Sequence, residues 1–572
     1  MPKGDAAAHL GPGYHDLAWQ RFEACTERPF DVVVIGGGVT GSGAALDAAT
    51  RGLSVALVEA RDFASGTSSR SSKLFHGGLR YLEQLEFGLV REALRERELM
   101  VQSLAPHLVK PVPFLYPLTH RGWERPYVAA GLTLYDTIGG RTKLPGQKHL
   151  SKRAALRMFP GLDPETLIGA VRYFDAQTDD ARHTLTVART AAKYGAVVRS
   201  STKVTGFARE SDRIVGVNVV DTDDGRETTL KAGVVLNCTG VWTDEIQALS
   251  GGRGRFRVRA SKGVHLVVPR ERITGDVGLI LRTETSVLFV IPWKAHWLIG
   301  TTDTDWDLDL AHPAATDADI DYLLDQVNAV LVTKLTREDI EGVYAGLRPL
   351  LAGESEETSG LSREHAVASV VPGLISIAGG KYTTYRVMAA DIVDAAAEEL
   401  PKLVPPSCTD RVPLLGADGY FAMRNQAGTL AAEYGLHPVR VRHLLDRYGA
   451  LIREVLDPAG ADASLLEEVN GAPDYLLAEI RYAATHEGAL HLEDVLARRT
   501  RISIEYPHRG TECAEQVAGV MAAVLGWSPA VRDAEVAAYR ARVVAERAAQ
   551  AQSEDGQADV LRQSAPDVRT YL

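Results

Sequence analysis

The sequence predicts an α/β fold with a first domain built on a βαβ unit, a second domain built on a separate sheet, and an all-helical C-terminal domain. Three patterns support this prediction. A strand, a glycine turn, a helix and a second strand follow one another over residues 31–59. Apolar runs typical of strands recur over 194–240 and 262–302, and beyond 408 the pattern is Ala-rich and helical. At 572 residues the chain exceeds the size that one hydrophobic core usually serves, so several domains are expected.

A glycine-rich turn follows the first predicted strand. Residues 32–35 form a β-branched apolar run that leads into Gly36, Gly38 and Gly41, spaced G-x-G-x-x-G. In such a turn the first glycine permits the tight bend, the second lets a pyrophosphate approach the backbone, and the third lets helix and strand pack closely. The helix predicted at about 43–51 would offer free N–H groups and the positive end of its dipole to phosphates.

An acidic residue ends the second strand of this unit. The strand covers 54–58, and Glu59 follows Gly41 by 18 residues. A carboxylate at this point can accept hydrogen bonds from both ribose hydroxyls and would repel a 2′-phosphate. The unit is therefore predicted to be Rossmann-like and to bind NAD or FAD rather than NADP. This segment alone leaves the choice between NAD and FAD open.

A run rich in hydroxyl and basic residues, 67–81, follows. Its donors suit a diphosphate or the carbonyl edges of a flavin ring, although a plain polar loop is the simpler interpretation. The ending His-Gly-Gly-Leu-Arg over 76–80 favours a functional role. The candidate cofactor-binding residues of this run are Thr67, Ser68, Ser72, Lys73, His76 and Gly77.

Helical periodicity predicts a helix over about 83–104. Its charged residues recur at i,i+4 spacing, which is typical of an exposed, salt-bridged face. This predicted face comprises Arg91, Glu92, Arg95, Glu96, Arg97 and Glu98. The next stretch, 110–146, mixes proline, aromatic, apolar and basic residues.

The later elements are predicted in order from the same patterns. They are strands over 194–240 with a turn at 222–225, a separate sheet between 262 and 302, a helix over 317–332, a buried strand over 374–378 and a helix over 384–400. Residues 401–407 are Pro-rich and form the clearest linker. Helices then follow at 421–434, 478–485, 514–525 and 530–549.

These elements suggest a division into domains. We expect a loosely ordered arm over 1–28, a nucleotide-binding domain over 29–400 with an interleaved substrate domain (roughly 110–180 and 255–350), a linker over 401–407, a helical domain over 408–552 and a flexible tail over 553–572. The helical domain has no pattern typical of an active site. We therefore expect it to cover the rest of the protein or to form oligomers.

A second glycine turn occurs near residue 380. A buried strand leads through Gly379 and Gly380 to Lys381, and Thr383 lies at the start of the next helix. Such a helix start can stabilise negative charge at the N1–C2=O edge of a reduced flavin, and Lys381 adds a full positive charge. The alternative is an ordinary turn with a solvated lysine.

Two further residues are candidates for the chemistry. Arg348 precedes a proline in Gly-Leu-Arg-Pro-Leu, and its guanidinium is suited to a phosphate or carboxylate, although a single arginine is usually a surface residue. His265 lies at the start of an apolar strand, where a core histidine with one backbone partner is common. Its ordinary pKa would nevertheless let it act as a base near neutral pH.

The composition excludes several classes of protein. The formal net charge of −11 argues against a protein that binds nucleic acid by neutralising phosphates. The four cysteines lie far apart and form no C-x-x-C pair, so neither a disulfide framework nor a zinc site is expected, and a reducing cytosol fits. No apolar stretch is long enough to predict a transmembrane helix, and residues 1–28 do not have the pattern of a secretory signal.

Taken together, the motifs resemble those of the FAD-dependent glycerol-3-phosphate dehydrogenases, the aerobic respiratory type within the D-amino-acid-oxidase-like flavoproteins. The matching segments are Val34-Ile-Gly-Gly-Gly-Val-Thr-Gly, Ser71-Ser-Lys-Leu-Phe-His-Gly-Gly-Leu-Arg-Tyr, Asn237-Cys-Thr-Gly240, Lys262-Gly-Val-His, Ile299-Gly-Thr-Thr-Asp, Gly346-Leu-Arg-Pro-Leu and Gly379-Gly-Lys-Tyr-Thr-Thr-Tyr-Arg. They occur in the family's order over 31 to about 395. The tail segment 492–500 also looks like the family's C-terminal domain.

The resemblance implies a Rossmann-like, D-amino-acid-oxidase-like domain with non-covalently bound FAD and a substrate domain built on a mixed sheet above the flavin. It adds Gly240 to the cofactor-binding residues above. It also implies oxidation of sn-glycerol 3-phosphate to dihydroxyacetone phosphate, with electrons passed to membrane quinone. For that reaction Arg80, Arg348 and Lys381 are the candidates to hold the phosphate. His265 is the candidate base that removes the C2 hydroxyl proton as hydride leaves for flavin N5, and Arg348 could instead orient that hydroxyl.

A lipid acceptor implies a peripheral position on the inner face of the cytoplasmic membrane. The candidate surface is 110–146, with Trp123, Tyr127, Leu132, Leu134 and Tyr135, although a buried core segment fits equally well. A homodimer is possible. The rival interpretations are a glycerol-3-phosphate oxidase that uses dioxygen, a D-amino-acid-type oxidase, and a flavin-loaded scaffold without turnover.

Overall fold

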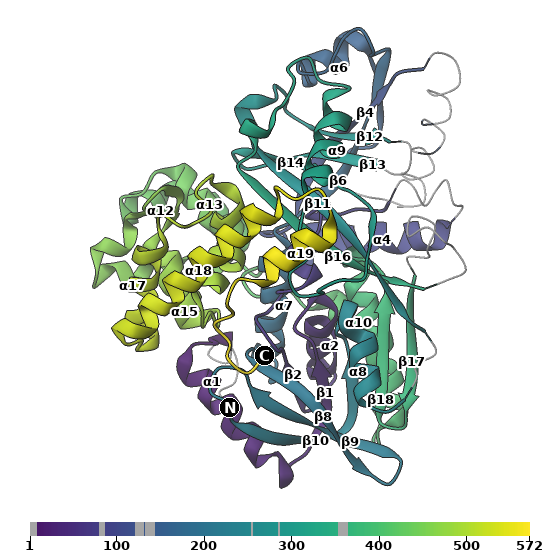
Figure 1. The fold of residues 1–572 in the computed structure, drawn as a ribbon, viewed down its shortest axis with the longest axis vertical. Coiled ribbons are helices and arrows are strands. Elements are labelled where there is room, and N and C mark those ends of the chain that lie inside the picture. Colours follow the sequence, from purple (N-terminus) through teal and green to yellow (C-terminus); the bar gives the residue numbers. More distant parts are fainter. Residues whose placement is uncertain are drawn as a thin grey trace.

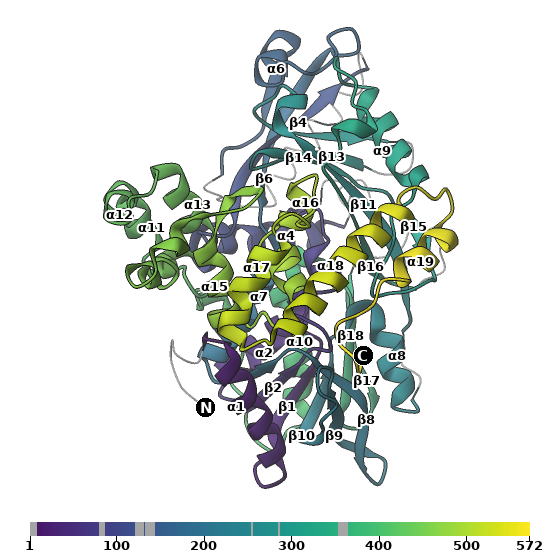
Figure 2. The same ribbon diagram turned by 60° about the vertical axis from the view of Figure 1, so that its left-hand side comes forward.

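The computed structural model describes residues 8–78, 86–120, 128, 131, 144–252, 256–283, 287–352 and 364–572. Within these ranges the chain forms an eight-stranded sheet, a ten-stranded sheet and a helical C-terminal part that packs beside both (Figures 1 and 2). This is the predicted arrangement of a Rossmann-like domain, a mixed-sheet domain and a helical domain. The exact domain boundaries given above remain our proposal.

The eight-stranded sheet has the order β17-β18-β10-β1-β2-β7, with β8 and β9 attached beside β10. Its strands are β1 (Phe30–Ile35), β2 (Val55–Val58), β7 (Val197–Arg199), β8 (Thr202–Glu210), β9 (Arg213–Asp221), β10 (Glu227–Asn237), β17 (His365–Val371) and β18 (Leu374–Gly379). Val34 pairs in parallel with Leu236 of β10 and Leu57 of β2. The apolar run in β1 is therefore buried on both faces, as predicted.

Three helices lie against this sheet: α2 (Val39–Thr50), α7 (Asp180–Lys193) and α10 (Tyr385–Glu399). Helix α2 begins at Val39, four residues before the predicted start. Its small residues let neighbouring helices approach closely. A Cβ on Gly43 would lie 3.0 Å from the ring of Tyr385 on α10. The sheet also carries α8 (Thr243–Leu249) after β10.

The ten-stranded sheet carries the predicted second domain. Its strands are β3 (Leu74–Phe75), β4 (Lys110–Leu118), β5 (Lys148–Ser151), β6 (Gly169–Gln177), β11 (Val258–Pro269), β12 (Gly278–Arg282), β13 (Val287–Trp293), β14 (His296–Gly300), β15 (Thr304–Trp306) and β16 (Gly342–Leu351). Strand β11 pairs with both β14 and β16, which sets His265 opposite Gly300 on one side and Tyr344 on the other. Helices α6 (Lys152–Met158) and α9 (Asp317–Asn328) accompany this sheet.

The C-terminal part is helical apart from a two-stranded ribbon of β19 (Glu468–Val469) and β20 (Ala472–Leu476). Its helices are α11 (Tyr420–Asn425), α12 (Ala427–Tyr434), α13 (Pro438–Tyr448), α14 (Ile452–Leu456), α15 (Leu477–His486), α16 (Ile502–Glu505), α17 (Ala514–Leu525), α18 (Pro529–Ala549) and α19 (Asp555–Gln563). They have a hydrophobic core of their own. None of the described helices combines the length and apolar character needed to cross a membrane.

The expectation of a loose N-terminal arm is wrong for the residues that the structure describes. Helix α1 (Pro12–Glu23) buries Trp19 and Phe22 in the core of the first domain. Just before it, the carbonyl of Ala8 accepts from Arg189 at 2.9 Å, and His9 lies 3.7 Å from Glu454 of the C-terminal part. Burial of these aromatic side chains holds the N-terminal residues in place. The acidic residues and glycines of this segment had suggested a loose arm.

The expectation of an exposed charged face on the helix near residue 90 is also wrong in part. Helix α4 (Phe87–Leu99) buries Glu96 and Arg97. Glu96 accepts two hydrogen bonds from Arg386 of α10, and Arg97 donates to Asp175 of β6 at 2.8 Å. The i,i+4 spacing does not distinguish an exposed ladder from ion pairs that join one helix to its neighbours.

Candidate active site

Residues of both sheets line one cavity of about 910 Å³, a size typical of cofactor sites. The predicted residues that line it are Gly36, Gly38, Glu59, Thr67, Ser68, Ser72, His76, Gly240, His265, Arg348, Gly379, Gly380, Lys381 and Thr383. The two glycine turns, more than 300 residues apart in the sequence, therefore meet at one site. Three of the other candidates do not line the cavity: Gly41, which packs against the first turn, Lys73 and Gly77. The remaining candidate, Arg80, lies outside the described residues.

The first glycine turn has no room for side chains. Gly36 has a φ of +106°, and a Cβ on Gly41 would lie 1.9 Å from the carbonyl oxygen of Gly36. Only glycine fits such a contact without moving the backbone. The close approach of turn and helix leaves the N-terminus of α2 open to the cavity.

Glu59 is held at the mouth of this turn. Its carboxylate accepts from the N–H of Gly37 at 2.7 Å and from the N–H of Arg61 at 2.9 Å. Burial raises the pKa of Glu59, and these two hydrogen bonds oppose that shift. The hydroxyl of Ser68 accepts from the N–H of Val39 at 2.9 Å and so caps the first turn of α2.

The hydroxyl-rich run that begins at residue 67 forms a loop that contacts strand β16. Thr67 donates to the carbonyl of Leu347 at 2.6 Å, and Tyr344 donates to the carbonyl of Ser71 at 3.0 Å. A Cβ on Gly346 would lie 2.5 Å from the carbonyl oxygen of Arg70, so glycine in Gly-Leu-Arg-Pro-Leu is needed for this contact. Strand β16, which carries Arg348, was not among the strands predicted from the sequence.

Lys73 does not reach the cavity, which differs from its predicted role. Its ammonium is fully buried and lies 2.8 Å from Asp180, which also accepts from the N–H and hydroxyl of Ser71. Burial and the nearby Arg501 lower the pKa of Lys73, whereas Asp180 raises it. Lys73 therefore anchors the loop from behind the cavity wall.

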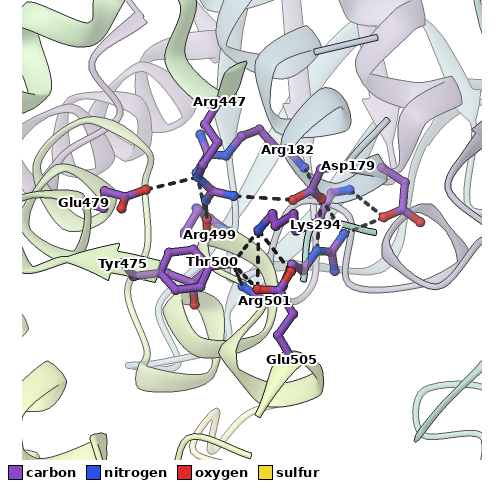
Figure 3. Close-up of polar contacts among 12 residues, drawn as sticks. Asp179, Arg182, Lys294, Arg447, Tyr475, Glu479, Arg499, Thr500, Arg501 and Glu505 are labelled. Carbon is purple, nitrogen blue, oxygen red and sulfur yellow. Dashed lines mark hydrogen bonds and ion pairs between the residues drawn. The ribbon is translucent and has the colours of Figure 1, made fainter. Parts of the chain in front are cut away.

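The C-terminal part holds this loop through Arg501. Its guanidinium donates to the carbonyl of Ser69 at 3.2 Å and to Asp179 at 2.7 Å, and it also pairs with Asp180. Figure 3 shows that Arg501 belongs to a larger set of buried polar contacts in which Arg447 joins Glu479 and Lys294 joins Glu505. Arg501 thus joins the helical part to the loop that carries Ser69. The residues Asp179, Asp180 and Arg501 had no recognisable motif in the sequence.

The second glycine turn joins directly to the first loop. Gly379 and Gly380 both have positive φ angles, of +76° and +78°, and a Cβ on either would meet atoms within 2.5 Å. Thr383 accepts from the N–H of His76 at 3.1 Å and donates to its carbonyl at 3.3 Å. The side chain of Thr383 therefore fixes the distance between the two motifs.

We expect replacement of Thr383 by Ala to weaken FAD binding by up to about tenfold, because one backbone N–H and one carbonyl lose their partner at a net cost of about 1 kcal/mol. Titration of the apoprotein with FAD measures this effect. Thr383→Ser keeps the hydroxyl and should bind nearly as well as the parent. Equal affinity of the Ala variant and the parent would show that this link is dispensable.

His265 lies in the middle of β11, further into the strand than predicted. Its Nε2 is 2.9 Å from the hydroxyl of Ser72, and its ring stacks on Tyr344 with centroids 4.8 Å apart. Its Nδ1 has no hydrogen-bond partner among the described residues. Burial, assisted by Arg348 and Lys73, lowers the pKa of His265 well below its usual value. The imidazole is therefore neutral near pH 7 and able to accept a proton.

Arg348 is held in a fixed position beside His265. It donates to the hydroxyl of Thr301 and the carbonyl of Thr302, both at 2.9 Å, and lies 3.3 Å from Asp303. A Cβ on Gly263 would lie 2.6 Å from this guanidinium. In the same way a Cβ on Gly300 would lie 2.4 Å from the ring of His265. These contacts explain the glycines in Lys-Gly-Val-His and Ile-Gly-Thr-Thr-Asp, and they add Thr301 and Asp303 to the site.

Comparison with known proteins decides the family. A model described as FAD dependent oxidoreductase matches residues 31–386, and one described as the C-terminal domain of alpha-glycerophosphate oxidase matches 407–532. Glycerol-3-phosphate dehydrogenase 2 of Mycobacterium tuberculosis is 67% identical over 570 residues, which cover 100% of this chain and 97% of that protein. The chain belongs to the FAD-dependent glycerol-3-phosphate dehydrogenase family.

Other members of the family are similar to this chain in sequence and in fold. The human mitochondrial glycerol-3-phosphate dehydrogenase is 36% identical over 521 residues, which cover 87% of this chain and 71% of that protein. The structure of the glycerol-3-phosphate dehydrogenase from Bacillus halodurans complexed with FAD is 30% identical, with a TM-score of 0.77 over 93% of this chain and 98% of that chain. FAD is thus the cofactor, as predicted.

The residues of the cavity fit FAD. The open N-terminus of α2 and the glycine cradle suit the pyrophosphate, and the Glu59 carboxylate beside them suits ribose hydroxyls. The turn that carries Lys381 places a cation and a helix start at another part of the same cavity, where a flavin edge can be stabilised.

Proposed function

We propose that this enzyme oxidises sn-glycerol 3-phosphate to dihydroxyacetone phosphate and passes the electrons to membrane quinone. The observation that carries the proposal is the pairing, in one cavity, of a neutral buried histidine with a rigid arginine. The names of the similar proteins support the choice of substrate. A secondary alcohol needs a base, and a dianionic phosphate needs fixed cations.

In this proposal Arg348 and Lys381 bind the phosphate. Arg348 is oriented by Thr301 and Asp303, so little conformational freedom is lost when it accepts a phosphate oxygen as partner. Arg80, which lies outside the described residues, remains a candidate for the same group. Lys381 also lies on the glycine turn and can serve the flavin edge.

His265 removes the C2 hydroxyl proton in this proposal, and Ser72 orients its ring. FAD, when bound, supplies the hydride acceptor at flavin N5. A base within hydrogen-bond reach of the hydroxyl typically contributes about 10²- to 10⁴-fold to the rate. A carboxylate-binding, D-amino-acid-type site would also use an arginine, so the substrate must be tested directly.

The experiment that tests the function is anaerobic reduction of the bound flavin. Addition of sn-glycerol 3-phosphate should bleach the oxidised flavin band near roughly 450 nm, whereas a D-amino acid should not. An unbleached flavin would instead support a scaffold without turnover. Peroxide production compared with quinone reduction then separates the dehydrogenase from a dioxygen-using oxidase.

The pH dependence of this step follows from the burial of His265. Because the pKa of its imidazole lies well below 6.5, the base stays unprotonated and the limiting rate of flavin reduction should remain constant from about pH 8 down to pH 6.5. The limiting rate should decrease only at pH values below that range, where the imidazole becomes protonated. Stopped-flow reduction at saturating substrate measures it, and a limb centred at or above pH 6.5 would contradict the assignment.

Quinone as acceptor implies contact with a membrane surface, and we propose a peripheral, cytoplasmic-face location for the enzyme. The first portion of the proposed contact segment, 110–118, forms strand β4 of the second sheet. Its aromatic and apolar candidates lie outside the described residues: Trp123, Tyr127, Leu132, Leu134 and Tyr135. Co-sedimentation with anionic vesicles tests the location. A homodimer remains a proposal that light scattering can decide.

A further inference from the structure

The last residues of the chain are ordered against the rest of the protein, which overturns the expectation of a flexible tail. Helix α19 is joined to strand β11 by an ion pair between Asp555 and Lys262. Beyond it, Arg569 is only 4% exposed and donates to Asp494 at 3.1 Å and to Ser201 at 3.3 Å. Contacts between charged groups far apart in the sequence hold this segment, so local polarity wrongly suggested disorder.

Residues 564–572, here called the strap, run from α19 to the first sheet. Asp567 lies 2.5 Å from Arg61, and the N–H of Tyr571 donates to the carbonyl of Thr222 at 3.0 Å. Figures 1 and 2 show this yellow segment descending from α19 and ending beside the strands of the first sheet. The strap is thus attached to loops of the first sheet, at Arg61 and Thr222, and to the C-terminal part, at Asp494.

The strap ends in the wall of the FAD cavity, because Leu572 lines it. The backbone contacts place that residue at the Glu59 end. Thr222, the partner of Tyr571, donates to the carbonyl of Ser201 at 3.0 Å, and the next residue, Thr202, donates to the carbonyl of Glu59 at 2.7 Å. Arg61, the partner of Asp567, and Thr202 line the same cavity.

We propose that the strap closes the nucleotide end of the cavity, with Leu572 covering the adenosine half of bound FAD, and that it slows FAD release. An apolar side chain at this position excludes water from the part of the ligand that it covers. The ion pairs of Asp567 and Arg569 hold it in place. The inference concerns the cofactor and is independent of the substrate proposed above.

The test compares FAD release from the full chain, from a chain lacking residues 571 and 572, and from Leu572→Ala. Both changes leave Arg569 and its contacts with Asp494 in place. Release is followed by FAD fluorescence after dilution, and by the FAD retained after gel filtration. Both changes remove the Leu572 side chain from the cavity wall, which predicts release about five- to thirtyfold faster.

Val560→Ala is the matched control, since Val560 on α19 is 70% exposed and does not line the cavity. It should release FAD at the parent rate. The melting temperature of each apoprotein shows whether a variant is folded. If the shortened chain does not fold, Leu572→Ala decides the question alone. Release within twofold of the parent by a folded variant would overturn the proposal.

Discussion

Replacement of His265 by Ala should slow reduction of the bound flavin by about 10²- to 10⁴-fold while FAD content stays unchanged. The imidazole is the neutral base beside Ser72, whereas His76, the other histidine in the described cavity wall, is joined through its backbone to Thr383. Loss of the base removes proton transfer from the step in which hydride leaves C2. Anaerobic stopped-flow absorbance at saturating substrate gives the limiting rate.

The control for this experiment is His149→Ala, which removes an exposed imidazole on β5 far from the cavity wall. Ser72→Ala adds a second readout. It leaves the base in place but removes its 2.9 Å partner, so a smaller loss of rate is expected. A His265→Ala enzyme that reduces its flavin within threefold of the parent rate would exclude His265 as the base.

Replacement of Arg348 by Ala should chiefly weaken substrate binding, by about 30- to 4,000-fold. Truncation of one partner of a buried, hydrogen-bonded charge pair typically costs about 2–5 kcal/mol, and each 1.4 kcal/mol is about tenfold in affinity. The dependence of the flavin-reduction rate on substrate concentration measures the dissociation constant. The substrate affinity of Arg348→Lys should lie between those of the parent and Arg348→Ala. An ammonium keeps the positive charge but loses the bidentate geometry of the guanidinium.

Arg259→Ala is the matched control for this arginine. Arg259 lies on the neighbouring strand β11 and pairs with Asp305 at the surface, so its loss should leave substrate affinity unchanged. Arg348→Ala also leaves Asp303 with one partner fewer, so FAD content and melting temperature must be recorded beside it. Unchanged saturation behaviour of Arg348→Ala would remove the phosphate assignment.

Local sequence patterns determined the elements that bind FAD. Strand β1, the glycine turn, helix α2 and Glu59 occur in the predicted order because their physical demands are local: a buried strand, a turn without side chains and an acid after the second strand. Helices α15, α17 and α18 were predicted from local periodicity in the same way. The family resemblance added the substrate, which no spacing of residues reveals.

Only the tertiary structure decided which charged groups are buried and what they touch. Lys73 looked like a cofactor ligand and instead pairs with Asp180, while Glu96 and Arg97 looked exposed and instead join α4 to its neighbours. The tail looked flexible and instead ends in the cavity wall. Ion pairs between residues 78 to 290 positions apart leave no periodic trace in the sequence, because their partners are brought together only when the sheets and helices pack.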